Sequence, residues 1–476
     1  MPMSMTSTPK SSDLLAALIQ IVGADNVLTA EADLQSCLTD WRGRYRGAAQ
    51  ALVRPGTAEE VAAVVQACAA TATPIVPQGG NTSLCGAATP DASGQAIVLS
   101  LSRLNRIRAV DAVNHTITVE AGCTLQTVQD AAAEAGCLFP LALASEGTCQ
   151  IGGNLSTNAG GVQVLRYGNM RELTLGLEVV LANGERWDGL RGLRKDNTGY
   201  DLKQVFIGAE GTLGVITAAV LKLFPRPAMQ QTAWIAIPHP AAALALLVSA
   251  QARFDARLTA FELISDVSLD LVVQHIPGSR APLQSAPYYV LCEVSGNVED
   301  ALERALETWL EQHLATGQAL DAVVAKSEAQ SRQLWHLRES ISEAQKIDGV
   351  SIKHDIAVPV SRIPEFLARA DAALTAAFPG LRIVTFGHVG DGNLHYNLSK
   401  AQHEANQDFL DRQAEVNRIV HDLVHALGGS ISAEHGLGQL KREEIQRYKS
   451  AIELEAMRAL KRALDPQGLM NPGKVI

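Results

Sequence analysis

The chain has 476 residues, of which 47% are hydrophobic and 19% are charged, and its formal net charge is −10. A chain of this length folds as two or more domains around separate cores. The acidic balance, without any basic run, argues against a nucleic-acid-binding surface. Seven cysteines are scattered singly, without a C-x-x-C pair, which fits a reducing compartment better than a disulfide framework.

Neither end of the chain nor its interior predicts a membrane segment. Residues 1–12 are polar with a single Lys, so we expect neither a secretory signal nor a transit peptide. The longest apolar run, near Ala241–Ala250, is too short to span a bilayer. We therefore expect a cytoplasmic protein whose membrane contacts, where they occur, are peripheral.

The first 80 residues predict a helical segment followed by a βαβ pattern. A helix is expected over Asp13–Val22, within an N-terminal segment of residues 1–45. A strand at Ala51–Val53 precedes a helix that runs to about Ala70, and Thr57 with Glu60 forms a capping box at its start. The next strand, Ile75–Val76, leads directly into a Gly-rich loop.

That loop, Pro77–Gly86, is the most informative stretch of the chain. Glycine has no Cβ and tolerates positive φ, so the backbone N–H groups of such a loop can approach an anion closely. Gln78, Asn81, Thr82 and Ser83 add side-chain donors, which suits a pyrophosphate. Neither common nucleotide fingerprint is present, and a polar surface turn is the alternative.

Two further Gly-rich segments follow, Glu146–Gly161 and Gly208–Ile216. Such composition is typical of flexible linkers, but Ile151, Leu155 and Val162 can anchor the first of them to a core. Together with the first loop, these segments predict one extended ligand bed. Between them we expect the following elements: a strand at Thr116–Ala121, a helix at Leu125–Ala135 and a hairpin at Leu173–Trp187 with a type I′ turn at Asn183-Gly184.

After a boundary at about Leu221–Pro227, strands alternate with longer helices. Strands are expected at Thr232–Ile237 and Tyr288–Val294, and a strand pair at Arg382–Phe386 and Asn393–Leu398. The expected helices are Val298–Leu314, Ser327–Ile347 and Ile363–Phe378. This pattern predicts an α+β domain built on an antiparallel sheet.

His388 and His395 flank a Gly-Asp-Gly turn that can bring both imidazoles to one side. By period-two alternation, Asn393, His395 and Asn397 share a strand face. With Glu434 the two histidines make a His/His/carboxylate set of the kind that holds a catalytic divalent ion. A polar hairpin with hydrogen-bonded histidines is the alternative.

Arg338, Ser342 and Lys353 can recognise a carboxylate. Arg338 and Ser342 are four residues apart on one expected helix and so share a face. Arg offers a planar fork and Lys a point charge. The alternative for Arg338 is a surface salt bridge with Glu339, Glu343 or Asp348. His435 is the candidate general base, with a buried structural His or a hydrogen-bond partner of a bound ligand as its alternatives.

Five stretches carry a resemblance to a known family: Pro77–Asn81, Ile151–Gly161 with Leu165–Gly168, Leu193–Leu202, Gly387–His395 and Ser432–Gly436. From about Asp40 to Ile476 the chain resembles the vanillyl-alcohol-oxidase/PCMH-type flavoproteins, nearest the D-2-hydroxyglutarate dehydrogenase branch of the D-2-hydroxy-acid dehydrogenases. The resemblance implies an α+β fold with a PCMH-type FAD-binding domain (46–227), a substrate or cap domain (228–429) and a C-terminal segment (430–476) that returns to the flavin.

The resemblance also implies where FAD is held. Related flavoproteins carry a histidine that bonds the flavin where this chain has Asn81, so we expect non-covalent FAD, with Cys85 and Cys149 as the remaining candidates for a covalent link. The implied FAD contacts are Pro77, Gln78, Gly79, Gly80, Asn81, Thr82, Ser83, Gly86, Glu146, Gly147, Ile151, Gly152, Gly153, Ser156, Asn158, Gly160, Gly161, Glu210, Gly214, Ile216 and Asn471.

The implied reaction is oxidation of a D-2-hydroxy acid to a 2-oxo acid by hydride transfer to FAD. The resemblance assigns a divalent metal, Zn²⁺ being the first expectation, to His388, His395 and Glu434, where it lowers the pKa of the substrate hydroxyl. The implied substrate ligands are Arg338, Ser342, Lys353, Asn397 and His435, of which His435 takes the hydroxyl proton. Relatives carry Thr at position 342, so the Ser here can shift the preferred chain length.

Two cations favour a second carboxylate, and hence D-2-hydroxyglutarate or D-malate. A D-lactate or glycolate dehydrogenase is the alternative, followed by a metal-dependent hydrolase and a non-catalytic flavin-binding module. Further expectations from the family are an electron-transfer flavoprotein or a quinone as electron acceptor, and a homodimer.

Overall fold

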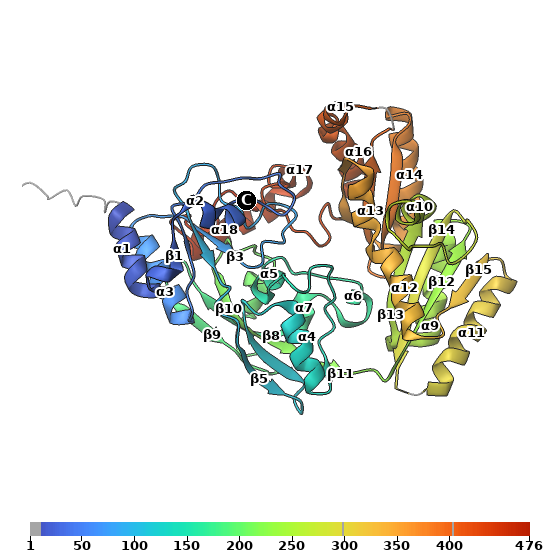
Figure 1. Ribbon diagram of the computed structural model, residues 1–476, viewed down its shortest axis with the longest axis horizontal. Coiled ribbons are helices and arrows are strands. Elements are labelled where there is room, and N and C mark those ends of the chain that lie inside the picture. Colours follow the sequence, from blue (N-terminus) through green and yellow to red (C-terminus); the bar gives the residue numbers. More distant parts are fainter. Residues whose placement is uncertain (1–10, 298, 402–403) are drawn as a thin grey trace, which may run out of the picture. The chain divides into compact units, whose positions relative to one another are not determined.

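The computed structural model describes residues 11–297, 299–401 and 404–476. The chain divides into two compact units (Figure 1). Unit 1 comprises the residues up to Gly160, Asn169–Arg226 and Glu434–Ile476, and unit 2 comprises Gly161–Gly168 and Pro227–Ala433.

Unit 1 begins with helices α1 (Ser11–Val22) and α2 (Glu31–Leu38) and a four-stranded sheet. The sheet order is β1 (Val27–Leu28), β2 (Ala51–Val53), β4 (Ile97–Ser100) and β3 (Ile75–Gln78), with β4 parallel to both β2 and β3. Helix α3 (Ala58–Ala70) starts where Thr57 accepts the Glu60 N–H at 3.1 Å. Glu60 in turn accepts the N–H of Gly56 rather than that of Thr57, so the expected capping box is shifted by one residue.

A second, fully antiparallel sheet completes unit 1. Its order is β5 (Ile107–Asp111), β6 (Thr116–Glu120), β10 (Val215–Lys222), β8 (Thr174–Val180) and β9 (Arg186–Gly189). The other elements of unit 1 are α4 (Leu125–Glu134), α5 (Ile151–Ser156), α7 (Met170–Leu173), α8 (Lys203–Phe206), α17 (Ile445–Tyr448), α18 (Ala451–Leu464) and the strand pair β7 (Cys137–Leu138) and β11 (Phe224–Pro225).

The β8–β9 hairpin has the expected strands but not the expected turn. A type I′ turn needs positive φ at both central residues, whereas only Gly184 of the pair Asn183-Gly184 has it, at 80°. The Leu181 N–H donates to the Glu185 carbonyl at 2.9 Å, which closes a three-residue loop with glycine in the left-handed position. The type I′ prediction was therefore wrong, because the loop holds three residues, 182–184, and pairing on the first strand ends one residue earlier than expected.

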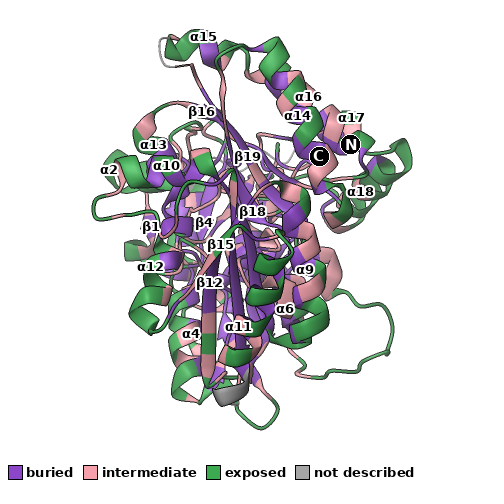
Figure 2. Ribbon diagram, turned by 90° about the vertical axis from the view of Figure 1, so that its right-hand side faces the viewer, coloured by how far each residue is buried: buried purple, intermediate pink, exposed green. Residues whose placement is uncertain are grey.

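Unit 2 is built on an eight-stranded antiparallel sheet, as the sequence predicted. Figure 2 shows its strands largely buried, with exposed helix faces around them. The path is β15 (Asp321–Val324), β12 (Met229–Ile237), β14 (Tyr288–Gly296), β13 (Leu258–Ser265), β18 (Arg382–His388), β19 (Asn393–Ser399) and β16 (Ser351–Ile352), and β17 (Asp355–Ala357) also pairs with β19. Its helices are α6 (Val164–Tyr167), α9 (Pro240–Phe254), α10 (Asp266–His275), α11 (Glu299–Ala315), α12 (Glu328–Glu339), α13 (Ile341–Asp348), α14 (Ile363–Ala377), α15 (Asn406–Asp411) and α16 (Gln413–Ala426).

The single helix expected over Ser327–Ile347 is interrupted at Ser340, between α12 and α13. The Ser340 hydroxyl lies 3.3 Å from His336 Nδ1, a local side-chain contact of the kind that competes with regular helix. Arg338 is buried and Ser342 is exposed, so the two residues do not share the helical face predicted for them. Among the helices that the structure describes, none combines the length and apolar character that crossing a bilayer requires.

Candidate functional site

The three Gly-rich segments meet in unit 1. A Cβ on Gly80 would lie 2.0 Å from the Thr148 carbonyl oxygen, so only glycine permits the first loop to pass this close to the second. The Glu210 N–H donates to the Ser156 carbonyl at 2.8 Å, which ties the third segment to the second. Every FAD contact implied by the resemblance belongs to unit 1, except Gly161, which belongs to unit 2.

The side-chain amides of Gln78 and Asn81 anchor the first loop to neighbouring backbone carbonyls. Gln78 Nε2 donates to the carbonyls of Cys37 (2.9 Å) and Ala88 (2.8 Å). Asn81 Nδ2 donates to the carbonyls of Ser36 (3.0 Å) and Thr39 (2.9 Å). These two amides, which we expected to face a pyrophosphate, instead hold the loop to residues 36–39 and 88. A contact between the backbone N–H groups of the loop and an anion stays a prediction.

Two buried polar atoms in this unit are acceptors that a bound group can satisfy. Gln150 Oε1 and Asn471 Oδ1 have no hydrogen-bond partner, although Asn471 Nδ2 is held by the carbonyls of Ala87 and Glu210. An unsatisfied buried acceptor costs about 1–3 kcal/mol, so each marks a position where a bound group can donate. The glycine-lined bed and these two acceptors fit FAD. Gln150 was missed by the sequence analysis, because nothing in its local pattern distinguishes it from a solvent-facing amide.

Glu210 has a different environment from the one predicted. Its carboxylate accepts the backbone N–H groups of Leu437 (2.7 Å) and Gly438 (2.8 Å), directly after His435. Burial raises the pKa of Glu210 above its ordinary value, against the lowering effect of these two donors and of Lys441. The Glu210 side chain therefore orders the segment that carries His435, and a contact between Glu210 and FAD stays a prediction.

In unit 2, neighbouring strands bring a row of polar side chains to one face of the sheet. Glu262 is the register partner of His388, while His395 has Phe386 on one side and Asp355 on the other. The imidazole centroids of His388 and His395 lie 5.9 Å apart. The β18–β19 hairpin thus turns both histidines to the same side, as the Gly-Asp-Gly turn predicted.

A buried acid links His388 to Arg338. Glu262 Oε1 lies 2.6 Å from His388 Nδ1, and Glu262 Oε2 accepts from Arg338 Nε at 2.8 Å. Burial alone would raise the pKa of Glu262, but His388 and Arg338 outweigh it and lower the value to about 2. The Arg338 guanidinium also lies over the Phe386 ring, 4.8 Å from its centroid. The ion-pair partner of Arg338 is thus Glu262, and not a surface acid of its own helix.

Asp355, His395, Glu434 and His435 make up a group of donors that could hold a metal ion. One ligand atom each from Asp355, His395, Glu434 and His435 lies within 4.8 Å of all the others. Glu434 and His435 follow Ala433, whose N–H donates to the Asp355 carbonyl at 3.2 Å. Two imidazoles with two carboxylates fit a divalent ion such as Zn²⁺. His388 is not a member of this group, and Asp355 was not predicted.

The remaining predicted substrate ligands are dispersed over unit 2. Asn397 is buried, with Nδ2 donating to Gln345 Oε1 (3.0 Å) and Oδ1 accepting the His354 N–H (3.1 Å). Lys353 directly follows β16, and Ser342 stands exposed on α13. Their contacts with a substrate stay predictions. Glu262 was the second residue missed, and its signal was present: a carboxylate in the middle of the apolar strand Leu258–Ser265.

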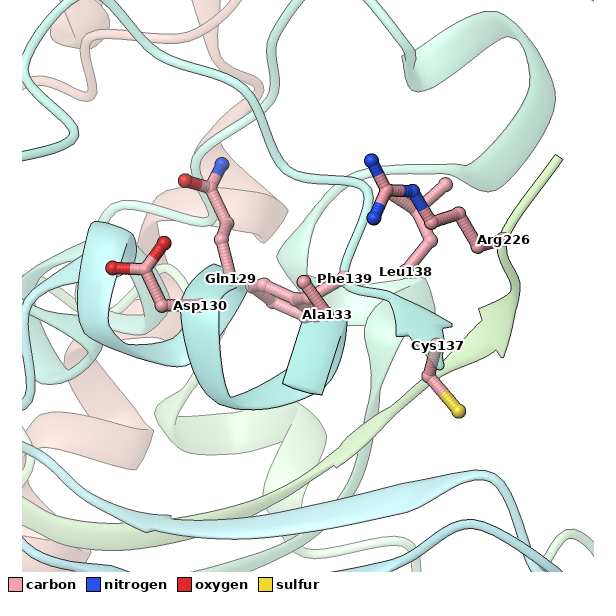
Figure 3. Close-up of a pocket in the computed structure, with 7 residues that line it drawn as sticks. All are labelled: Gln129, Asp130, Ala133, Cys137, Leu138, Phe139 and Arg226. Atoms are coloured by element: carbon pink, nitrogen blue, oxygen red, sulfur yellow. The ribbon is translucent and has the colours of Figure 1, made fainter. Parts of the chain in front are cut away.

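A cavity of about 210 Å³ lies elsewhere in unit 1, at α4 and β7 (Figure 3). Asp130 and Arg226 lie at opposite sides of it in this view. Its volume is below the range of about 300–1,000 Å³ typical of small-molecule sites. None of its lining residues belongs to the predicted site: Gln129, Asp130, Ala133, Cys137, Leu138, Phe139 and Arg226.

Two family models match the chain: "FAD binding domain" over residues 49–188 and "FAD linked oxidases, C-terminal domain" over residues 226–475. The D-2-hydroxyglutarate dehydrogenase of Xanthomonas citri pv. viticola is 40% identical over 462 residues, which cover 97% of this chain and 96% of that protein. The mitochondrial D-2-hydroxyglutarate dehydrogenase of Bos taurus is 39% identical over 466 residues, which cover 98% of this chain and 84% of that protein.

Solved structures share the fold at low sequence identity. p-Cresol methylhydroxylase with substrate bound aligns with a TM-score of 0.77 at 17% identity, covering 98% of this chain and 96% of that one. 4-Ethylphenol oxidase from Gulosibacter chungangensis aligns with a TM-score of 0.71 at 18% identity, covering 99% and 98%. These similarities confirm the expected PCMH-type α+β fold.

Proposed function

Because the chain belongs to the D-2-hydroxyglutarate dehydrogenase family of FAD-linked oxidoreductases, we propose that it oxidises D-2-hydroxyglutarate to the 2-oxo acid, with D-malate as a second substrate. The observation that carries this proposal is the similarity over nearly the whole chain, which includes both the Gly-rich segments of unit 1 and the histidine strands of unit 2. FAD, when bound, supplies the acceptor for the hydride. Both matched models are flavin families, which does not favour the metal-dependent hydrolase.

In this proposal the side chains of unit 2 bind the substrate. Arg338 and Lys353 bind its carboxylates, helped by the Ser342 hydroxyl and the Asn397 amide. The support for Arg338 is its fixed orientation: Nε and Nη2 face Glu262, so Nη1 is the part of the fork that does not take part in this ion pair. Two cationic ligands favour a dicarboxylate over lactate or glycolate.

An imidazole nitrogen of His435 accepts the hydroxyl proton of the substrate. Its support is that an imidazole nitrogen of His435 belongs to the same donor group as Glu434 and His395. His395 and Glu434 of this donor group, together with His388, the third ligand that the resemblance implies, would hold a Zn²⁺ ion, which polarises the substrate hydroxyl when bound. Glu210 keeps the backbone after His435 in place during proton transfer.

The test is anaerobic mixing of the purified protein with D-2-hydroxyglutarate while the flavin absorbance is followed. We expect bleaching by the D-isomer and by D-malate, and none by the L-isomer. Bleaching by D-lactate or glycolate alone would replace the dicarboxylate with a monocarboxylate substrate. A reconstituted protein that no hydroxy acid bleaches would leave only a flavin-binding role.

We also infer that FAD is bound without a covalent link, since Asn81 occupies the position of the bonding histidine and its amide is held by two carbonyls. An electron-transfer flavoprotein or a quinone as electron acceptor, and a homodimer, stay predictions. So does a cytoplasmic location, and relatives include mitochondrial proteins.

A further inference from the structure

Among the acids of unit 2 whose burial the structure describes, Glu262 is the most completely enclosed, with no exposed surface. It lies in the middle of β13, where apolar residues surround it in sequence, and the next strand in the sheet presents His388 as its register partner. Placing an ionised carboxylate in such an interior is costly unless charged or polar groups satisfy both oxygens. Each oxygen of Glu262 has such a partner, and the two partners are different functional residues.

The contact with His388 fixes that imidazole chemically as well as spatially. Glu262 Oε1 lies 2.6 Å from His388 Nδ1, a distance that requires the proton to lie on Nδ1 or between the two atoms. A neutral imidazole with Nδ1–H presents its lone pair at Nε2. This is the arrangement by which a carboxylate orients a histidine toward a metal ion and increases its basicity.

The contact with Arg338 fixes the guanidinium. Nε and Nη2 both approach Glu262 Oε2 at 2.8 Å, and the Phe386 ring lies against the guanidinium plane. A planar fork held on one edge and one face has a single orientation left for its other edge. One carboxylate thus determines the direction of both His388 and Arg338, although they are on different elements.

We propose that Glu262 is a positioning residue: one of its oxygens orients His388 as a metal ligand, and the other orients Arg338 for the distal carboxylate of the substrate. The inference rests on the proposed function, because it assigns a substrate contact to Arg338. It predicts that a single substitution at position 262 weakens both metal binding and dicarboxylate binding.

Glu293 provides a matched control. It is also a buried glutamate of this sheet, on the neighbouring strand β14, but its donors are neutral: Trp335 Nε1 at 2.9 Å and Thr259 Oγ1 at 3.0 Å. A Glu293→Gln variant therefore removes a buried carboxylate of the same sheet without touching His388 or Arg338. Any effect of Glu262→Gln that Glu293→Gln shares reflects the sheet and not the proposed role.

The experiment measures Zn²⁺ affinity of the metal-stripped, FAD-loaded full-length protein by titration, and KM and kcat for D-2-hydroxyglutarate. For Glu262→Gln we expect Zn²⁺ affinity to fall 10- to 100-fold and KM to rise roughly tenfold, with FAD content unchanged. Because Glu262→Gln leaves Arg338 as an unpaired buried cation, the double variant Glu262→Gln/Arg338→Met is measured as well. It should fold and still bind Zn²⁺ about tenfold more weakly than the wild type.

Unchanged Zn²⁺ affinity in both Glu262 variants would overturn the proposal, and so would an equal loss in Glu293→Gln. A wild-type protein that binds no Zn²⁺ would overturn it too, since Glu262 would have no metal ligand to orient. The proposed function fails in a different way. If the wild-type flavin is not reduced by D-2-hydroxyglutarate while Zn²⁺ affinity depends on Glu262, the substrate is wrong and the metal-orienting role stands.

Discussion

Glu262 and Glu293 lie on adjacent strands of one sheet, yet their environments move their pKa values in opposite directions. Burial alone would raise the pKa of Glu262, but its contacts with His388 and Arg338 lower it, so the stability this group contributes is complete above the ordinary glutamate value and is lost as pH falls toward about 2. Burial dominates at Glu293, and the hydrogen bonds from Trp335, Thr259 and Thr232 do not compensate it, so its pKa is raised. What distinguishes the two acids is the charge of their donors and not their depth.

The raised pKa of Glu293 predicts a pH dependence of stability. The folded protein binds the Glu293 proton more tightly than the unfolded chain, so this group destabilises the fold progressively as pH rises above 4.5, the value from which its pKa is raised. Glu293→Gln removes that effect. We expect the difference in urea midpoint between the variant and the wild type to move in favour of the variant from pH 5 to pH 8. Parallel midpoint curves over this range would contradict the assignment.

At the residue scale, contacts set by local chain geometry were predictable from the sequence, and contacts between distant strands were not. The convergence of His388 and His395 follows from a four-residue turn and period-two alternation, and it was predictable. The partner of His388 is 126 positions away on β13, and the partner of Arg338 is 76 positions away. No periodicity in one sequence encodes a contact across strands that are not consecutive. Asp355 was missed for the same reason, because it becomes a neighbour of His395 only through the pairing of β17 with β19.

At the scale of elements, strand and helix positions were predictable, and their ends and interruptions were not. Hydrophobic alternation located β12, β14, β18 and β19, but the break between α12 and α13 depends on one contact of Ser340. The chain from His435 to Gly438 is a similar case, since its course depends on Glu210 more than 200 residues earlier. Gly438 has a φ of 51°, and a Cβ at this position would lie only 2.2 Å from the Cys85 carbonyl oxygen, so no larger residue fits here.

This segment provides a test that separates two roles for Glu210. A glutamine at position 210 accepts one of the two N–H groups and directs its own NH₂ at the other, so we expect a loss of about 1–3 kcal/mol in the stability of this segment. Hydrogen exchange at Leu437 and Gly438 should accelerate and kcat should fall roughly tenfold, while FAD affinity changes little. A large loss of FAD affinity with unchanged exchange would instead support the direct FAD contact that the resemblance implied.

At the scale of the whole molecule, unit 1 is assembled from three separate stretches of chain. Residues 434–476 contribute to its centre: Met470 is fully buried in the core cluster that contains Ile75, and the Asn471 N–H donates to the Ile75 carbonyl at 2.8 Å. Asn471 then reaches Ala87 and Glu210, the first and third ligand-bed regions. The ligand bed is therefore a property of the complete unit, which no continuous part of the sequence reproduces.

Removal of FAD should consequently destabilise unit 1 much more than unit 2. A non-covalent flavin is released into the supernatant by acid precipitation, whereas retention in the pellet would indicate a covalent bond. For native apoprotein, prepared under mild conditions, FAD added at 100 times its dissociation constant stabilises the form that binds it by about 2.7 kcal/mol. Because one kcal/mol corresponds to roughly 2–4 °C in a unit of this size, we expect the unit 1 transition to rise by about 5–10 °C.

Hydrogen exchange shows which unit each transition belongs to: on FAD binding, protection should increase in Pro77–Gly86 and Glu146–Gly160 and stay constant in β14. Equal protection of β14 would mean that the two units unfold as one cooperative body, and no change in either would place the flavin outside the Gly-rich bed.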